Sequence, residues 1–107
     1  MSQLVKERIG RLARNASPAI AGGRKGIEKE SLRVFPDGSL ADTPHPEALG
    51  SAMTNAFITT DFSEALLEFV TPAFVNTWEA LRVLCEIHQL TYERLEDELL
   101  WVTRMPC

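Results

Sequence analysis

Residues 26–34, Gly-Ile-Glu-Lys-Glu-Ser-Leu-Arg-Val, place two glutamates at alternate positions of a segment that is otherwise typical of a β-strand. Side chains alternate between the two faces of a strand, so Glu28 and Glu30 should point the same way, about 7 Å apart. Two negative charges at that spacing, with no basic residue between them on the same face, repel each other. We therefore expect a strand whose acidic face is covered by water or by a cation.

The composition limits the kind of protein. The chain has 107 residues, of which 45% are hydrophobic and 24% charged, and this predicts one globular domain with a small core. The net charge of −4 and the lack of a Lys/Arg cluster argue against a nucleic-acid partner. No apolar run is long enough to cross a membrane, and the charged N-terminus lacks the apolar centre of a signal peptide. We expect a cytoplasmic protein with free thiols at Cys85, within the core, and at Cys107.

Two segments have the apolar spacing of helices. The first covers residues 3–16 and should end near Ser17-Pro18, because the residue before a proline avoids helical angles. The second should begin at Asn76, a good N-cap, and continue to about Leu100. The stripe expected to cover the sheet comprises Trp78, Leu81, Leu84, Cys85, His88, Tyr92, Leu95 and Leu99. We interpret His88 on this stripe as a packed core residue.

Turn signals follow the first strand. Pro-Asp-Gly at residues 36–38 predicts a hairpin turn that returns the chain through Leu40. Residues 46–49 should form one helical turn ended by Gly50. His45 lies between two prolines, and we expect it to be exposed and to have no catalytic role.

Further strands are expected in the middle of the chain. Residues 57–62 are rich in β-formers, and residues 63–70 are interpreted as another strand. This second strand would place Glu64 and Glu68 on one face. Asp61 is out of phase with them, so it can join them only if the chain bends nearby.

Five acidic residues are candidates for one site, namely Glu28, Glu30, Asp61, Glu64 and Glu68. One interpretation is the wet face of a half-exposed sheet, where alternate glutamates are common. The other is a cation site, because both acidic strands carry apolar residues on each face and buried carboxylates need a cation. All the donors are oxygens, which suits Mg²⁺, Mn²⁺ or Ca²⁺, and room for phosphate oxygens fits Mg²⁺–ATP best.

A second possible phosphate site is the glycine-rich segment at residues 22–26. It has no Walker pattern, and a strand follows it where a phosphate-binding loop would lead into a helix. A plain turn is therefore the favoured interpretation.

Five stretches of the chain form a specific pattern: residues 26–34, Asp37-Gly38 with Leu40, His-Pro-Glu-Ala-Leu-Gly-Ser-Ala at 45–52, Ile-Thr-Thr-Asp-Phe-Ser-Glu-Ala-Leu-Leu-Glu-Phe-Val-Thr-Pro at 58–72, and Met-Pro-Cys at 105–107. In order and spacing they resemble the N-terminus of bacterial glutamate–cysteine ligase (γ-glutamylcysteine synthetase). The resemblance runs over essentially the whole chain, and the long block at residues 59–72 is highly specific.

The resemblance implies an enzyme that joins the γ-carboxylate of L-glutamate to the amine of L-cysteine through a γ-glutamyl phosphate, while ATP is cleaved to ADP and phosphate. This is the first step of glutathione biosynthesis. The resemblance also implies an α+β fold, with an antiparallel sheet and flanking helices that form part of a funnel like that of glutamine synthetase. Both reacting groups come from substrates, so no catalytic nucleophile of the protein is expected.

The same resemblance assigns roles to individual residues. Positions that match the family's metal ligands are Glu28, Glu30, Asp61 and Glu68. They would hold Mg²⁺, or Mn²⁺ in its place, against the phosphates of ATP, where the ions neutralise the oxygens during phosphoryl transfer. The substrate-binding candidates are Arg33, Phe62 and Glu64.

Members of this family are several times longer than 107 residues. We therefore expect residues 1–107 to be a single incomplete domain, the N-terminal part of the ligase catalytic domain. Its partner would be the remainder of the ligase chain, and alone it should be inactive. Two alternatives stay open: a standalone acidic metal-binding or regulatory module without catalysis, and a structural piece whose acids are solvated.

Overall fold

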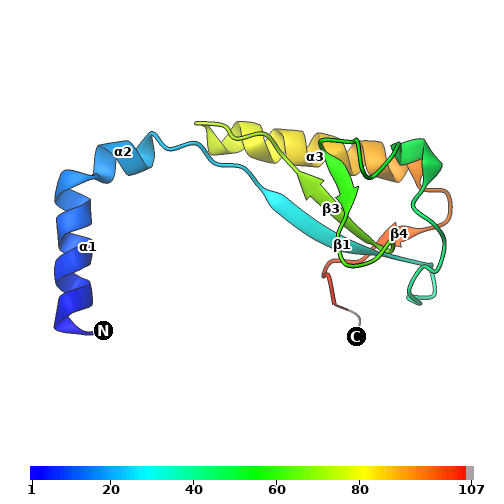
Figure 1. The fold of residues 1–107 in the computed structure, drawn as a ribbon, viewed down its shortest axis with the longest axis horizontal. Coiled ribbons are helices and arrows are strands. Elements are labelled where there is room, and N and C mark those ends of the chain that lie inside the picture. Colours follow the sequence, from blue (N-terminus) through cyan, green and yellow to red (C-terminus); the bar gives the residue numbers. More distant parts are fainter. Residues whose placement is uncertain (106–107) are drawn as a thin grey trace.

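The computed structural model describes residues 1–105 and shows a four-stranded antiparallel sheet with one long helix against it and two N-terminal helices apart from it (Figure 1). In chain order the elements are α1 (Gln3–Asn15), α2 (Ser17–Ala21), β1 (Glu28–Val34), the 3-10 turn η1 (Glu47–Leu49), β2 (Ile58–Thr60), β3 (Leu66–Val70), α3 (Thr77–Arg94) and β4 (Leu99–Leu100). The predicted α+β class and antiparallel sheet are confirmed. Within residues 1–105, no helix combines the length and the apolar character needed to cross a membrane.

β1 is a central strand of the sheet, whose order is β2-β3-β1-β4. The first part of β1 pairs with β3, so that Glu30 lies directly opposite Glu68. The last two residues of β1, Arg33 and Val34, pair with β4 on the other side. Burial increases along β1 from its first residue, the exposed Glu28, to its last four residues, which are buried. The strand is therefore anchored at one end and open to solvent at the other.

α3 covers one face of the sheet (Figure 1). The Asn76 side chain caps this helix by accepting a hydrogen bond from the backbone N–H of Trp78 at 2.9 Å, as predicted. The core between helix and sheet contains Leu49, Ile58, Leu67, Phe69, Ile87 and Leu95. The ring of His88 meets that of Phe69 edge to face, with centroids 4.7 Å apart, which confirms His88 as a packed residue.

The predicted C-terminus of this helix was wrong. α3 ends at Arg94, and Leu95 is already extended, so the helix stops before the expected end at Leu100. The reason is tertiary, because the chain turns back and Leu99–Leu100 complete the sheet beside β1. A local helical pattern cannot compete with an open strand edge that gains hydrogen bonds and buries apolar surface.

The apolar stripe of α3 is also rotated relative to the prediction. The fully buried positions are Ala80, Ile87 and Thr91, and the hydroxyl of Thr91 donates to the carbonyl of Ile87. Cys85, expected in the core, is exposed. Other predicted stripe residues that are exposed are Trp78, Leu81, Tyr92 and Leu99. Small residues at 80 and 91 let the helix approach the sheet closely, and hydrophobicity alone does not signal that.

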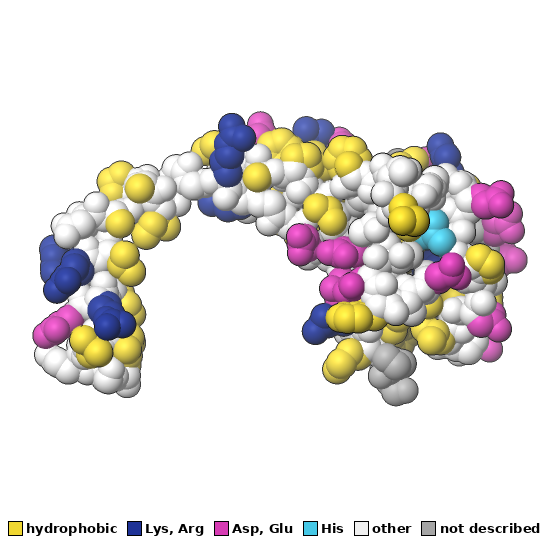
Figure 2. Space-filling model, in the orientation of Figure 1, with side chains coloured by type: hydrophobic (Ala, Val, Ile, Leu, Met, Phe, Trp, Pro, Cys, Tyr) yellow, Lys and Arg dark blue, Asp and Glu magenta, His cyan; other side chains and the backbone are white. Residues whose placement is uncertain are grey.

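The N-terminal helices stand apart from the sheet (Figure 1). α1 ends before Pro18 as predicted, but a second helix, α2, then begins at Ser17 with Pro18 in its first turn, a position to which proline is well suited. No side chain of α1 is buried, and its apolar residues Leu4, Ile9 and Leu12 are exposed. Figure 2 shows hydrophobic side chains along the edge of α1 that faces the hollow of the molecule.

The loops after β1 follow their turn signals with one exception. Residues 35–39 form the predicted turn, with a single bridge between Val34 and Leu40. η1 is ended by Gly50, whose φ of 78° favours glycine. His45, predicted to be exposed, is instead half-buried, and its Nε2 lies 3.0 Å from the Gly50 carbonyl oxygen. Cys107 lies outside the described residues.

Candidate functional site

The acidic residues of β1 and β3 lie on the face of the sheet that α3 does not cover. Glu30 is opposite Glu68 in the antiparallel register, and Glu28 is two residues along the same face. Lys29 alternates to the helix-covered face, where its Nζ lies 5.9 Å from the centre of the Phe69 ring. The prediction that Glu28 and Glu30 share a face therefore agrees with the register. Figure 2 shows acidic side chains gathered where the sheet faces the hollow of the molecule.

Asp61 reaches this face because the chain bends, as the sequence required. The strand predicted for residues 63–70 begins only at Leu66, and residues 61–65 form the turn between β2 and β3. The backbone N–H of Asp61 donates to the carbonyl of Leu66 at 3.1 Å, which closes this hairpin. Thr59 is opposite Glu68, so Asp61, two residues further on, lies on the same side of the sheet as Glu68.

The burial expected for these acids was wrong. Both acidic strands were interpreted as buried on each face, but Glu28 and Asp61 are exposed, and Glu30 and Glu68 are only half-buried. Apolar packing on this face is confined to the other end of the strands, where Leu32, Ala65 and Leu66 meet Trp101. Within residues 1–105, the acidic end is covered only in part.

The carboxylates influence one another electrostatically. Desolvation, followed by repulsion from Asp61, Glu28 and Glu30, raises the pKa of Glu68 above its ordinary value. Desolvation and then the hydrogen bond and charge of Glu30 raise the pKa of Asp61, and the positive charge of Arg104 opposes that shift. A raised carboxyl pKa means that the ionised form is disfavoured, so this face would gain from an additional cation.

The donor set is chemically suited to a hard divalent cation, since all four groups are carboxylates. They do not form a complete metal site by themselves. Within residues 1–105, no three Asp, Glu, His or Cys side chains converge closely enough to hold an ion. One oxygen is engaged elsewhere, as Glu30 Oε2 pairs with Arg104 Nη1 at 3.1 Å. The assignment of Glu28, Glu30, Asp61 and Glu68 as metal ligands stays a prediction.

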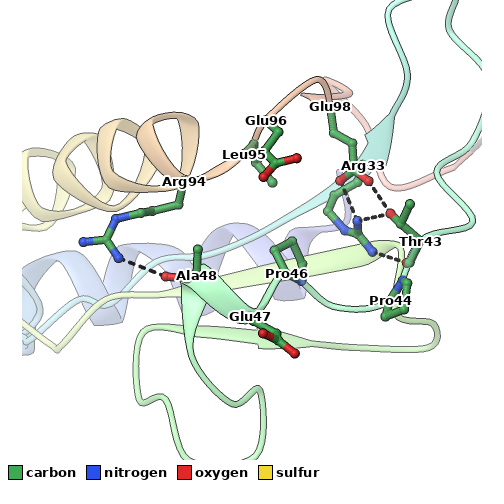
Figure 3. A pocket seen from close by; sticks show the side chains of 10 residues that line it. All are labelled: Arg33, Thr43, Pro44, Pro46, Glu47, Ala48, Arg94, Leu95, Glu96 and Glu98. Atoms are coloured by element: carbon green, nitrogen blue, oxygen red, sulfur yellow. Dashed lines mark hydrogen bonds and ion pairs between the residues drawn. The ribbon is translucent and has the colours of Figure 1, made fainter.

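Arg33 lies on the opposite face from the acids and is fully buried. Its guanidinium pairs with Glu98 Oε2 at 2.5 Å and donates to the hydroxyl and carbonyl of Thr43, both at 2.8 Å, as Figure 3 shows. It also donates to the backbone carbonyl of Glu64 at 3.0 Å. The side chain thus ties together β1, the loop before η1, the β2–β3 turn and the segment before β4.

A cleft of about 440 Å³ opens beside this network (Figure 3). Pro46 and Glu47 line one side, and Glu96 and Glu98 line another. The side chain of Arg94 points away from Arg33 and donates to the carbonyl of Ala48 at 3.0 Å. The cleft lies on the helix side of the sheet, so it is separate from the acidic face.

The remaining two substrate candidates lie in the β2–β3 turn beside Asp61. Phe62 is 86% exposed, and Glu64 is also exposed. The structure therefore places Phe62 and Glu64 in one turn with Asp61. Arg33 contacts this turn only by donating a hydrogen bond to the Glu64 carbonyl.

Two residues that pair with candidate residues were not predicted from the sequence, Glu98 with Arg33 and Arg104 with Glu30. A signal for the first was available, because an arginine in a buried strand requires a carboxylate partner somewhere in the chain. Neither residue could be placed from local pattern, since each contact spans a long sequence separation, 65 residues for Arg33–Glu98 and 74 for Arg104–Glu30.

Comparison with known proteins gives a consistent result. The sequence profile of the glutamate–cysteine ligase family matches residues 9–107. The glutamate–cysteine ligase of Pseudomonas putida is 51% identical over 107 residues, which is all of this chain and 20% of that protein. The enzyme of Alcanivorax borkumensis is 54% identical over 93 residues, covering 87% of this chain and 18% of that protein. The chain thus spans about a fifth of the length of the curated relatives it matches.

Solved structures agree with the sequence comparison. The glutamate–cysteine ligase of Francisella tularensis, in complex with AMP, matches 74% of this chain and 16% of its own, with 39% identity and a TM-score of 0.72. A bifunctional glutathione synthetase from Pasteurella multocida matches 99% of this chain and 14% of its own, with 32% identity and a TM-score of 0.78. The second match includes nearly the whole chain, the N-terminal helices with it.

Proposed function

The chain belongs to the glutamate–cysteine ligase family, and we propose that residues 1–107 form the N-terminal part of the catalytic domain of such a ligase. The complete ligase would join the γ-carboxylate of L-glutamate to the amine of L-cysteine, with ATP cleaved to ADP and phosphate, as the first step of glutathione biosynthesis. We expect it to act in the cytoplasm. The other part of the ligase chain would complete the funnel-shaped sheet and supply the rest of the site.

The observation that carries the proposal is the set of carboxylates on the open sheet face. Glu28, Glu30 and Glu68 share that face through the β1–β3 register, and the β2–β3 turn adds Asp61. In the proposed role these four side chains hold Mg²⁺, or Mn²⁺ in its place. A bound divalent cation would neutralise the triphosphate oxygens and so favour transfer of the γ-phosphoryl group.

The chemistry explains why acids, and no nucleophile of the protein, are needed. A carboxylate is a poor electrophile, and phosphorylation turns the γ-carboxylate of glutamate into an acyl phosphate with a good leaving group. The nitrogen of cysteine then attacks the carbonyl carbon, the C–O bond to phosphate breaks, and the amine loses its proton. The four carboxylates take no part in bond formation. Their role is to hold positive charge where phosphate oxygens gather.

The substrate-binding residues extend the proposal to the neighbouring turn. Phe62 and Glu64 follow Asp61 in the β2–β3 turn and are open to solvent, so they can contact a bound amino acid or nucleotide. Arg33 supports this turn from below through the Glu64 carbonyl. ATP as co-substrate is supported by the AMP bound to the Francisella tularensis relative.

The test uses the complete ligase that contains this segment. Glu68→Gln should lower ATP-dependent γ-glutamylcysteine formation by about 100-fold or more, because one anionic ligand is lost at unchanged size. The matched control is Glu86→Gln on α3, an exposed glutamate that pairs only with Arg82 within the described residues. An unchanged rate in Glu68→Gln at saturating Mg²⁺ would refute the metal-ligand role. Product formed by the 107-residue chain alone would refute its status as an incomplete domain.

A further inference from the structure

Arg104 occupies a position that the ligase reaction leaves without a role. We propose that Arg104 is an internal counter-ion of the acidic face, and that a divalent cation binds there by displacing its guanidinium from Glu30. This inference rests on the proposed metal-binding role of the carboxylates. It adds a residue that sets how tightly the cation is held.

The backbone places Arg104 beside Glu30. After β4, the chain continues along the edge of β1, where the N–H of Trp101 donates to the carbonyl of Leu32 at 2.7 Å. The N–H of Leu32 in turn donates to the carbonyl of Thr103 at 3.3 Å. Arg104 is the next residue, and its Nη1 lies 3.1 Å from Glu30 Oε2. These two backbone hydrogen bonds hold the segment before Arg104 against β1 and so bring Arg104 close to Glu30.

Arg104 is the cation that faces these acids. Within residues 1–105, its contact with Glu30 is the one ion pair made by any of the four carboxylates. Lys29 points to the other face of the sheet, and Arg33 is committed to Glu98. One positive charge thus partly neutralises the candidate ligand Glu30.

The ion pair between Arg104 and Glu30 can be broken at little energetic cost. The side chain of Arg104 is 59% exposed while that of Glu30 is 21% exposed, so the guanidinium can swing into solvent at little cost and the carboxylate stays in place. A divalent cation at Glu30 carries twice the charge, and a neighbouring guanidinium would repel it. Cation and arginine therefore compete for the same oxygen.

The experiment measures Mn²⁺ binding to the complete ligase that contains this segment by the loss of the free-ion EPR signal. Arg104→Gln should bind Mn²⁺ about two- to tenfold more tightly than the wild-type ligase, the range expected when one exposed competing charge is removed. Arg104→Lys keeps the charge and should stay near wild type. Arg82→Gln removes the arginine of another exposed ion pair, 63% and 59% exposed, and should change nothing.

A second readout follows the contact itself. Titration of Mg²⁺ into the wild-type ligase should shift the side-chain ¹⁵N–¹H NMR signals of Arg104 toward those of a solvated arginine, and leave those of Arg33 unchanged. Unaltered or weaker Mn²⁺ binding in Arg104→Gln, with measurable binding in the wild type, would overturn this inference alone. If neither ligase binds Mn²⁺ at millimolar concentrations, the proposed metal site fails, and the inference fails with it.

Discussion

Removal of the buried arginine of β1 gives the sharpest test of what holds this sheet together. In Arg33→Met, the chain loses four hydrogen bonds, to Glu98, to the hydroxyl and carbonyl of Thr43, and to the carbonyl of Glu64. Glu98, whose side chain is only 12% exposed, would then keep its charge without a cation. Removing one partner of such a buried pair costs about 3–5 kcal/mol.

The size of this effect should differ clearly from that of a surface pair. Arg82→Met breaks the exposed Arg82–Glu86 contact on α3 and should change the free energy of unfolding by less than about 1 kcal/mol. The double variant Arg33→Met with Glu98→Met removes both charges, so it should regain about 1–4 kcal/mol relative to Arg33→Met alone. The difference among these variants, more than any single value, tests the role of the buried pair.

Urea unfolding of the 107-residue chain, followed by circular dichroism, measures these differences. If Arg33→Met is too unstable to fold, Arg33→Lys keeps the charge but loses the planar fork, and it should show an intermediate loss. The proposed role of the buried pair is refuted if Arg33→Met and Arg82→Met lower the free energy of unfolding by the same amount. It is also refuted if the double variant is less stable than Arg33→Met, because the isolated Glu98 charge would then not be the source of the loss.

Three further predictions concern the acidic face and α3. Because Asp61 and Glu68 have pKa values raised above the ordinary 3.8 and 4.5, their contribution to stability is present below those values and is lost as the pH rises through the raised ones. Thermal melts of the metal-free chain should show this loss, and Glu68→Gln should reduce it; the same pH dependence in both chains would contradict the assignment. Glu30→Gln removes one of the repelling charges and should leave the melting temperature no lower than wild type, while it abolishes ligation in the complete enzyme. A large drop in melting temperature would show that Glu30 stabilises the sheet. Asn76→Ala removes the cap on Trp78 N–H and should destabilise the chain by about 1 kcal/mol in urea titrations, and no change would mean that solvent replaces the cap.

Local signals predicted the boundaries that depend on neighbouring residues and missed those that depend on distant contacts. The first turn of α3 was predictable because Asn76 caps it within a few residues. Its end at Arg94 was not, because it depends on β4 pairing with β1 across more than 60 residues. In the same way, Pro18 correctly ended α1, but local pattern did not show that the chain would continue as α2.

The candidate site was predictable to the extent that it depends on alternation. Strand periodicity put Glu28 and Glu30 on one face, and the need for a bend at Asp61 was met by the β2–β3 turn. The pairing of Glu30 with Glu68 depends on register, which no short segment contains. Burial was misjudged because the apolar residues of both strands cluster at one end, and composition does not show where along a strand its cover lies.

The exposed helix α1 has a consequence for the dynamics of the chain. It has 13 residues and no buried side chain, so its order rests on its own backbone hydrogen bonds, and isolated helices of that length are marginal in water. Amide hydrogens of α1 should therefore exchange with deuterated solvent almost as fast as those of a free peptide, while those of β1 and β3 are protected. Slow exchange within α1 would then report that another surface has come to rest against its apolar edge.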